Sequence, residues 1–432
     1  MEITPSTPVL PHNWARRFFT VWTGQAFSLV GSAIVQFALV WWLTQKTGSA
    51  TILATASLVA MLPQIFLAPF AGTLVDRWNR RVVMIVADSL IAVATLVLMY
   101  LFWAGRIQVW HIYLILLIRS AGGAFHYPAM QASTSLMVPR EQLARIAGLN
   151  QTLSGINGII APPLGAFLIS ILPTQWVLAI DVGTAAIAVS ILAAVSIPQP
   201  PRQLAQANCT ARQTTFWQDL REGWEYMVGW PGLLGVSLLA MVINFLLTPA
   251  ASLLPLLVTK VYKGGALQLG WMDSSFSIGI IAGGLILSAW GGFKKRIVTS
   301  MVGIAGIGLG IALLGVLPPS WFYVALVGAI LAGFMQAWAN GPLGAIFQAT
   351  VDPDIQGRVL TLLSAGATAM SPLGLLVAGP VSDWLGVRTW YLIGGGACIL
   401  MTVVGSSIPA IMNIEQNARK AGQADLPTSA TK

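Results

Sequence analysis

Charged residues are scarce in this sequence. They make up 9% of the 432 residues, whereas soluble globular domains carry roughly 25%. Hydrophobic residues make up 56%, and the mean hydropathy is +0.77. This composition excludes an ordinary soluble domain, a disordered chain, a collagen and a nucleic-acid-binding protein.

Cysteine and histidine are also rare, with two and three residues. Cys209 and Cys398 fit neither a disulfide framework nor a metal site, so we expect both to be structural. No Gly-x4-Gly-Lys-Ser/Thr phosphate loop occurs, which argues against ATP hydrolysis. Three scattered histidines do not supply the catalytic cluster of a membrane enzyme. The sequence therefore predicts no enzyme activity, no cofactor and no bound metal.

Long apolar runs dominate the chain instead, and each is long enough for the roughly 20 residues that span a bilayer. They predict an all-α membrane protein with twelve transmembrane helices in two six-helix halves. The runs cover residues 18–43, 51–73, 82–104, 109–137, 146–171, 175–197, 232–259, 268–290, 297–317, 321–349, 359–380 and 389–411.

The interruptions are short except for residues 198–231, a proline-rich and charged stretch typical of a linker. The predicted organisation is an N-terminal tail over 1–17, a first half over 18–197, a linker over 198–231, a second half over 232–411 and a C-terminal tail over 412–432.

The cations are distributed unequally between the two sides of these spans. Seventeen of the 23 lysines and arginines fall in the tails, the linker and the loops on the side of the termini. Five fall on the other side, and Arg119 lies within a span. Because cytoplasmic loops are rich in lysine and arginine, both termini are predicted to be cytoplasmic.

The two halves repeat short patterns. The run AGGAF at 121–125 is matched by AGF at 332–334, and Pro-Leu-Gly at 163–165 is matched at 372–374. Two related six-helix halves predict a substrate site between them, near the bilayer midplane.

The loop after the second span resembles the G-x-L-x-D-R-x-G-R-R signature of the major facilitator superfamily. Its matching residues are Gly72, Asp76, Arg77, Arg80 and Arg81. The resemblance implies a conformational latch, in which Gly72 allows close helix packing and Asp76 accepts from a helix N-terminus or an arginine. Asn79 replaces the usual glycine, and we expect it to preserve the turn because asparagine tolerates a left-handed conformation.

Four charged residues lie within spans, where an unpaired charge is costly. Arg119 resembles the family's R-x-x-Q-G motif without its glutamine. It is either a functional residue or the partner of one intramembrane carboxylate. Asp88, Asp181 and Asp273 are candidate proton-coupling residues, and the alternative for each is a carboxylate near interfacial water.

The fifth span resembles an antiporter motif through Gly148, Asn157, Pro162 and Gly165. Small residues and a proline allow this helix to bend and pack closely. The motif favours an exporter over an importer. Candidate cavity residues come from spans one, four, seven and ten, and packing is the alternative role for each of them. They are Gln25, Gln36, Phe125, His126, Met241, Asn244, Phe245, Gln336, Trp338 and Asn340.

Nearly the whole chain is similar to the macrolide efflux proteins of the drug:proton antiporter group. The similarity is carried by residues 22–29 and 43–50, by Ile118-Arg119-Ser120 and by Ala179 to Val182. It implies a monomer in the cell inner (plasma) membrane that exports amphiphilic drugs of the macrolide type in exchange for protons. Two alternatives remain open, an exporter of an endogenous metabolite or siderophore and a membrane receptor or assembly protein without transport.

Overall fold

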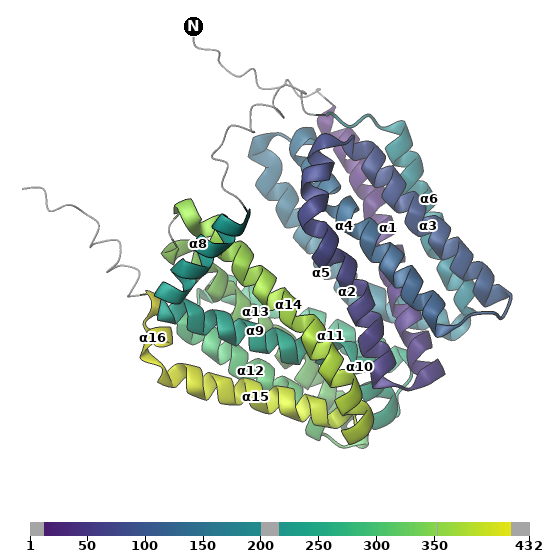
Figure 1. Cartoon of the computed structure of the whole chain (residues 1–432). Helices are drawn as coiled ribbons and strands as arrows, with labels where there is room; N and C mark the ends of the chain where they lie inside the picture. The colour runs from purple at the N-terminus through teal and green to yellow at the C-terminus, as the bar shows by residue number, and fades with distance from the viewer. Residues whose placement is uncertain (1–12, 200–215, 352, 416–432) are drawn as a thin grey trace, which may run out of the picture. The chain divides into compact units, whose positions relative to one another are not determined.

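The computed structural model describes residues 13–199, 216–351 and 353–415. Parts of both predicted tails and of the predicted linker, with Cys209, lie outside the described residues. The regular elements of the described residues are all helices or helical turns (Figure 1). In lipid the backbone amides and carbonyls have no water to bind, so a helix that satisfies them internally is the structure expected.

The long helices of the first part are α1 (Trp14–Thr47), α2 (Ala50–Arg77), α3 (Arg80–Trp103), α4 (Val109–Met137), α5 (Leu143–Ile171) and α6 (Thr174–Ala194). Those of the second part are α9 (Pro231–Ser252), α11 (Ala266–Trp290), α12 (Arg296–Val316), α13 (Phe322–Thr350), α14 (Pro353–Leu385) and α15 (Val387–Ser407). The shorter elements are α8 (Phe216–Gly229), α10 (Leu254–Leu256), α16 (Pro409–Met412), a π turn (Leu257–Val261) and two 3-10 turns (Arg140–Gln142 and Pro319–Trp321).

These helices confirm the predicted fold class. Eleven helices within the described residues are long and apolar enough to cross a membrane. Helix α4 is the twelfth long helix, with 29 residues, and it carries Arg119 and His126. Each predicted span coincides with a helix to within a few residues, except that the seventh continues from α9 through α10 into the π turn.

The chain divides into two compact units. Unit 1 contains residues 1–42 and 59–211, and unit 2 contains residues 43–58 and 212–432. The end of α1 and the beginning of α2 therefore cluster with the helices of the second sequence half. We call residues 43–58 the α1–α2 corner.

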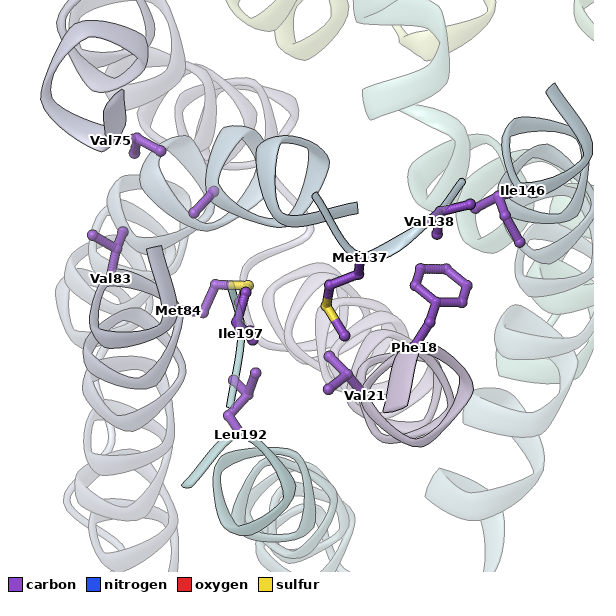
Figure 2. Packing of buried hydrophobic residues seen from close by; sticks show 11 residues of the cluster. Phe18, Val21, Val75, Val83, Met84, Met137, Val138, Ile146, Leu192 and Ile197 are labelled. Carbon is purple, nitrogen blue, oxygen red and sulfur yellow. The ribbon is translucent and has the colours of Figure 1, made fainter. Parts of the chain in front are cut away.

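A hydrophobic cluster at one end of unit 1 draws residues from all of its long helices (Figure 2). Phe18 and Val21 of α1 pack with Met84 of α3, Met137 of α4 and Leu192 of α6, all of them almost fully buried. In Figure 2 these side chains converge between the helix ends. The cluster holds the ends of the helices together beneath the polar interior of the unit.

An ion pair joins the helices of unit 1 in their middle. Arg119 Nη1 of α4 donates to Asp181 Oδ2 of α6 at 2.6 Å and to Thr95 Oγ1 of α3 at 3.1 Å. Ser32 Oγ of α1 donates to the other Asp181 oxygen at 3.0 Å, and Arg119 Nη2 donates to the Ser32 carbonyl at 3.3 Å. Asp181 is 1% exposed. The paired charges thus connect four helices and satisfy each other away from water.

Unit 2 is held instead by backbone-to-backbone packing. A methyl group added at Gly279 or Gly283 of α11, or at Gly333 of α13, would overlap the backbone of the facing helix. Gly303 and Gly310 of α12 face α13 in the same way. Small residues allow membrane helices to approach closely, and this close approach supplies the van der Waals contact that stabilises them in lipid.

We expect Gly333→Ala to destabilise the protein by about 1–3 kcal/mol, because the added methyl group has no space against the Phe276 carbonyl. The measurement is the thermal unfolding midpoint of the purified protein in detergent. Gly344→Ala on the same helix is the matched control, since a methyl group there meets no described atom within 4 Å. Equal midpoints for the two variants would contradict the packing argument.

Replacing one partner of the central ion pair should lower the free energy of unfolding more than replacing both partners. Arg119→Met and Asp181→Leu each leave one buried charge without its partner. Each variant should therefore lower the free energy of unfolding by about 3–5 kcal/mol. The double variant should be more stable than either single variant, as measured by thermal unfolding. The exposed pair of Arg221 and Glu225 on α8 is the control, and Arg221→Met should leave the midpoint unchanged. Additive losses in the double variant would show that the two charges act independently.

Candidate functional site

A cavity of about 790 Å³ lies within unit 1. Helices α1, α3, α4 and α5 line it. Ligand sites for drug-sized molecules typically have volumes of about 300–1,000 Å³. The cavity is therefore large enough for a sizeable small molecule.

Asp88 of α3 is the carboxylate at this cavity. Gln25 Nε2 of α1 donates to Asp88 Oδ2 at 3.1 Å, and His126 Nε2 of α4 lies 3.4 Å from Asp88 Oδ1. Asp88 is 7% exposed, and all three residues line the cavity. An imidazole beside a carboxylate forms an ion pair when the imidazole is protonated.

The same three helices also carry Arg119 and two of the hydrogen-bonding partners of the central ion pair, Ser32 and Thr95, at a spacing of seven residues. Gln25 precedes Ser32 on α1, Asp88 precedes Thr95 on α3, and His126 follows Arg119 on α4, each by seven residues. Seven residues make about two helical turns, so each pair lies on one face of its helix. The interior of unit 1 thus contains two polar layers about 10 Å apart. We call them the Asp88 layer and the Arg119 layer.

The rest of the cavity wall combines aromatic rings with amides and hydroxyls. Trp22 Nε1 of α1 donates to Asn150 Oδ1 of α5 at 2.7 Å, and Gln131 Nε2 donates to the Tyr127 hydroxyl at 2.6 Å on α4. Apolar side chains such as Met130 lie between them. A wall of this kind suits an amphiphilic molecule, with apolar contact over most of its surface and a few polar groups to orient it.

The structure brings together four of the residues predicted from the sequence. Gln25, His126, Asp88 and Arg119 all line the cavity. Asp181 lies behind Arg119 in the ion pair and does not line it. Two other predicted cavity residues of the first half lie elsewhere: Gln36 is exposed, and Phe125 stacks on Trp78 with ring centroids 6.3 Å apart.

The predicted residues of the second half belong to unit 2. Asn244 donates to the carbonyl of Ala240 in its own helix, and Trp338 donates to the Gly283 carbonyl at 3.2 Å. Asp273 lies in α11, about two turns from its beginning. The remaining residues of this set, with their helices, are Met241 and Phe245 on α9, and Gln336 and Asn340 on α13.

Sequence reasoning missed most of the polar cavity wall, although a helical signal was present. On α4 the residues Gly123, Tyr127, Met130 and Thr134 recur every three or four positions, and on α5 Ser154 follows Asn150 by four positions and Gln151 by three. Polar residues at that spacing share one face of a helix. In an otherwise apolar span, such a face indicates a surface that is not in contact with lipid.

The predicted latch segment binds the ends of its neighbouring helices. Arg80 Nη1 donates to the Ala132 carbonyl of α4 at 2.9 Å, and Arg81 Nε donates to the Leu192 carbonyl of α6 at 2.6 Å. Cations stabilise the carbonyl-bearing ends of helices. Asp76 is 71% exposed at its side chain and lies 3.4 Å from Arg80.

Two details of the latch differ from expectation. Asn79 is extended, with φ −70°, and it accepts from the Arg81 and Val82 amides as the N-cap of α3. Asn79 thus lies in the turn between α2 and α3, but it does so without the left-handed conformation given as the reason for the expectation, because an N-cap requires an extended residue with a side-chain acceptor. The close helix approach expected at Gly72 is not present among the described residues, since a methyl group there meets nothing within 4 Å. Arg77 is exposed.

The antiporter-like segment of α5 packs against α1 at one position. A Cβ at Gly165 would lie 3.2 Å from a ring carbon of Phe37, so a larger residue there would push the Phe37 ring aside. Pro162 lies inside the helix, and Gly148 faces open space within the described structure. The Asn157 side-chain oxygen is buried without a hydrogen-bond partner among the described residues.

Known relatives match the chain over almost its full length. A family model described as transmembrane secretion effector, within the major facilitator superfamily, matches residues 7–429. Macrolide efflux protein A of Streptococcus pyogenes is 34% identical over 404 residues, covering 94% of this chain and 98% of that protein. The multidrug efflux pump Tap of Mycolicibacterium fortuitum is 25% identical over 402 residues, covering 89% and 94%.

Solved transporters share the fold. The nucleoside transporter NupG superposes with a TM-score of 0.66 at 15% identity, over 91% of this chain and 98% of that one. A bacterial homologue of the iron transporter ferroportin gives 0.68 at 15% identity, over 91% and 99%. The predicted resemblance to macrolide efflux proteins is confirmed. The chain is a multi-pass membrane protein of the transmembrane secretion effector family, within the major facilitator superfamily of transporters.

Proposed function

We propose that this transporter exports hydrophobic, mainly cationic drugs of the macrolide kind, in exchange for protons that enter the cell. The family and its efflux relatives support a drug exporter of the plasma membrane. The observation that carries the proposal is the Asp88 layer, a carboxylate, an imidazole and an amide that share the wall of a drug-sized cavity.

The Asp88 layer provides a place where a proton and a drug cation exclude each other. With Asp88 ionised and exposed to the cavity, a basic amine of the drug can form a charge-assisted hydrogen bond with it. A proton taken up by Asp88 or by His126 alters this attraction and releases the amine. Binding of one and release of the other are then linked, which is the requirement for exchange.

The Arg119 layer is less suited to this exchange. Both Asp181 oxygens accept hydrogen bonds, and the Arg119 guanidinium is bound to three neighbours. Separating these two charges in lipid would cost several kcal/mol in every cycle. We propose that this layer supports the wall on which the Asp88 layer lies.

The energy of exchange depends on the charge of the drug. One proton moving inward across 100 mV releases about 2.3 kcal/mol. For a neutral drug this is enough for a gradient of about fortyfold, at roughly 1.4 kcal/mol per tenfold. A drug with one positive charge exchanged for one proton moves no net charge, so only the pH difference drives it. The stoichiometry therefore decides which drugs are concentrated outside.

The proposed transport cycle is alternating access, in which the two six-helix halves expose the site to one side of the membrane and then to the other. We propose that both termini are cytoplasmic, as the unequal distribution of lysine and arginine predicts. The transporter works as a monomer in this proposal. The second candidate function, export of an endogenous metabolite or siderophore, uses the same cavity and the same proton exchange.

The test is the accumulation of a labelled macrolide in drug-sensitive cells, with and without a protonophore. Cells with the wild-type protein should retain less drug, and the protonophore should abolish the difference. Asp88→Asn should raise accumulation to the level of cells without the protein, because the amide carries no charge to exchange. Asp273→Asn is the matched control, since Asp273 is also within a membrane helix but does not line the cavity.

Each outcome has a distinct meaning. Loss of export in Asp273→Asn together with normal export in Asp88→Asn would move proton coupling from the Asp88 layer to unit 2. Unchanged accumulation with well-expressed wild-type protein would remove macrolides as substrates and favour the endogenous metabolite or siderophore.

A further inference from the structure

Asp383 near the end of α14 binds the beginning of α2. Its carboxylate accepts from the Ala50 amide at 2.7 Å, from the Thr51 amide at 2.9 Å and from the Ser49 hydroxyl at 2.9 Å. The first amides of a helix have no partner within the helix, and they carry the positive end of its dipole. An aspartate from another helix thus supplies the N-terminal cap of α2.

The helices are also in close contact beside this cap. Gly379 lies four residues before Asp383, about one turn along α14. A methyl group at Gly379 would lie 2.8 Å from Thr51 Cα and 3.2 Å from Ala54 Cβ. The absence of a side chain at residue 379 therefore allows α14 to approach α2 closely enough for Asp383 to reach the amides.

The contact joins segments that are far apart in the sequence. Residues 49–51 belong to the α1–α2 corner, between the first two spans, whereas Asp383 lies near the end of the eleventh long helix. Through this contact the corner belongs to unit 2, although the rest of α1 and α2 belongs to unit 1. The loop between α1 and α2 lies on the side opposite the termini, which the charge pattern places outside the cell.

We propose that Asp383 is a gating residue, which holds the α1–α2 corner against α14 when the outer side of the transporter is closed and releases it when that side opens. The inference rests on the alternating access proposed above. Any movement that separates the first six helices from the last six at their outer ends has to break the three hydrogen bonds of Asp383. Closing that side restores them.

The setting of Asp383 suits a contact that breaks in each cycle. The residue is exposed at the end of its helix, so water can replace its partners when it leaves. The ion pair of Arg119 and Asp181 differs in this respect, because the two side chains are only 10% and 1% exposed. An accessible cap therefore makes the closed state more stable without preventing its opening.

The test measures the distance between the two sides of this contact. Spin labels are placed at Lys46→Cys on α1 and Trp384→Cys on α14, both exposed, after Cys209 and Cys398 have been replaced by serine. Continuous-wave and pulsed electron spin resonance on the full-length protein in nanodiscs then give the ratio of short to long distances. Asp383→Asn should lower this ratio about tenfold, the effect of losing a helix cap.

Two further variants complete the design. Ser49→Ala removes one of the three hydrogen bonds and should lower the ratio by less, and it remains informative where Asp383→Asn does not fold. Glu415→Gln is the matched control, since the Glu415 carboxylate accepts from the Arg296 amide at 2.9 Å at the beginning of α12, within the second half of the sequence. It should leave the ratio unchanged.

The result that overturns the proposal is an equal ratio in Asp383→Asn, Ser49→Ala and the wild type. A single short distance in the wild type under every pH and drug condition also overturns it, because the contact would then be permanent. Both readings are independent of drug flux. A shifted ratio in a protein that exports no macrolide would therefore support the gate and reject the proposed substrate.

Discussion

The ion pair of Arg119 and Asp181 is the interaction on which the first unit depends. A charge within a membrane helix is expensive unless an opposite charge and hydrogen-bond donors surround it. Here the pair draws α4 and α6 together and takes Ser32 of α1 and Thr95 of α3 as further partners. Four helices are thereby held in one register, and that register places Gln25, Asp88 and His126 beside one another two turns away.

The two polar layers of unit 1 show how similar residues come to have different roles. Each layer contains an aspartate, a basic partner and a neutral donor, and the two layers use the same faces of α1, α3 and α4. In the Arg119 layer α6 contributes the carboxylate, and the group is closed on itself. In the Asp88 layer the carboxylate faces the cavity, where a ligand can compete for it. The proposed roles of the two layers therefore differ because a ligand in the cavity can reach the carboxylate of Asp88 and not that of Asp181.

In the second unit, helices α11, α12 and α13 associate through close backbone packing and not through an ion pair. Its glycines bring the backbones of α11, α12 and α13 into direct contact, and that contact is strong because it is continuous along the helices. Two of its carboxylates lie at helix ends, where Asp383 and Glu415 cap the beginnings of α2 and α12.

The twelve helices could be predicted from the amino-acid sequence, because lipid leaves a polar backbone no alternative and a span of about 20 apolar residues is a local property. It also identified Arg119 and Asp88 as exceptional, since charge in such a span is rare. The packing of the helices was needed to show that Arg119 pairs with Asp181 rather than Asp88, that Gln36 and Phe125 lie away from the cavity, and that the α1–α2 corner clusters with α14. Those outcomes depend on which helix faces meet, and contacts between distant spans leave no periodicity in the chain from which they can be predicted.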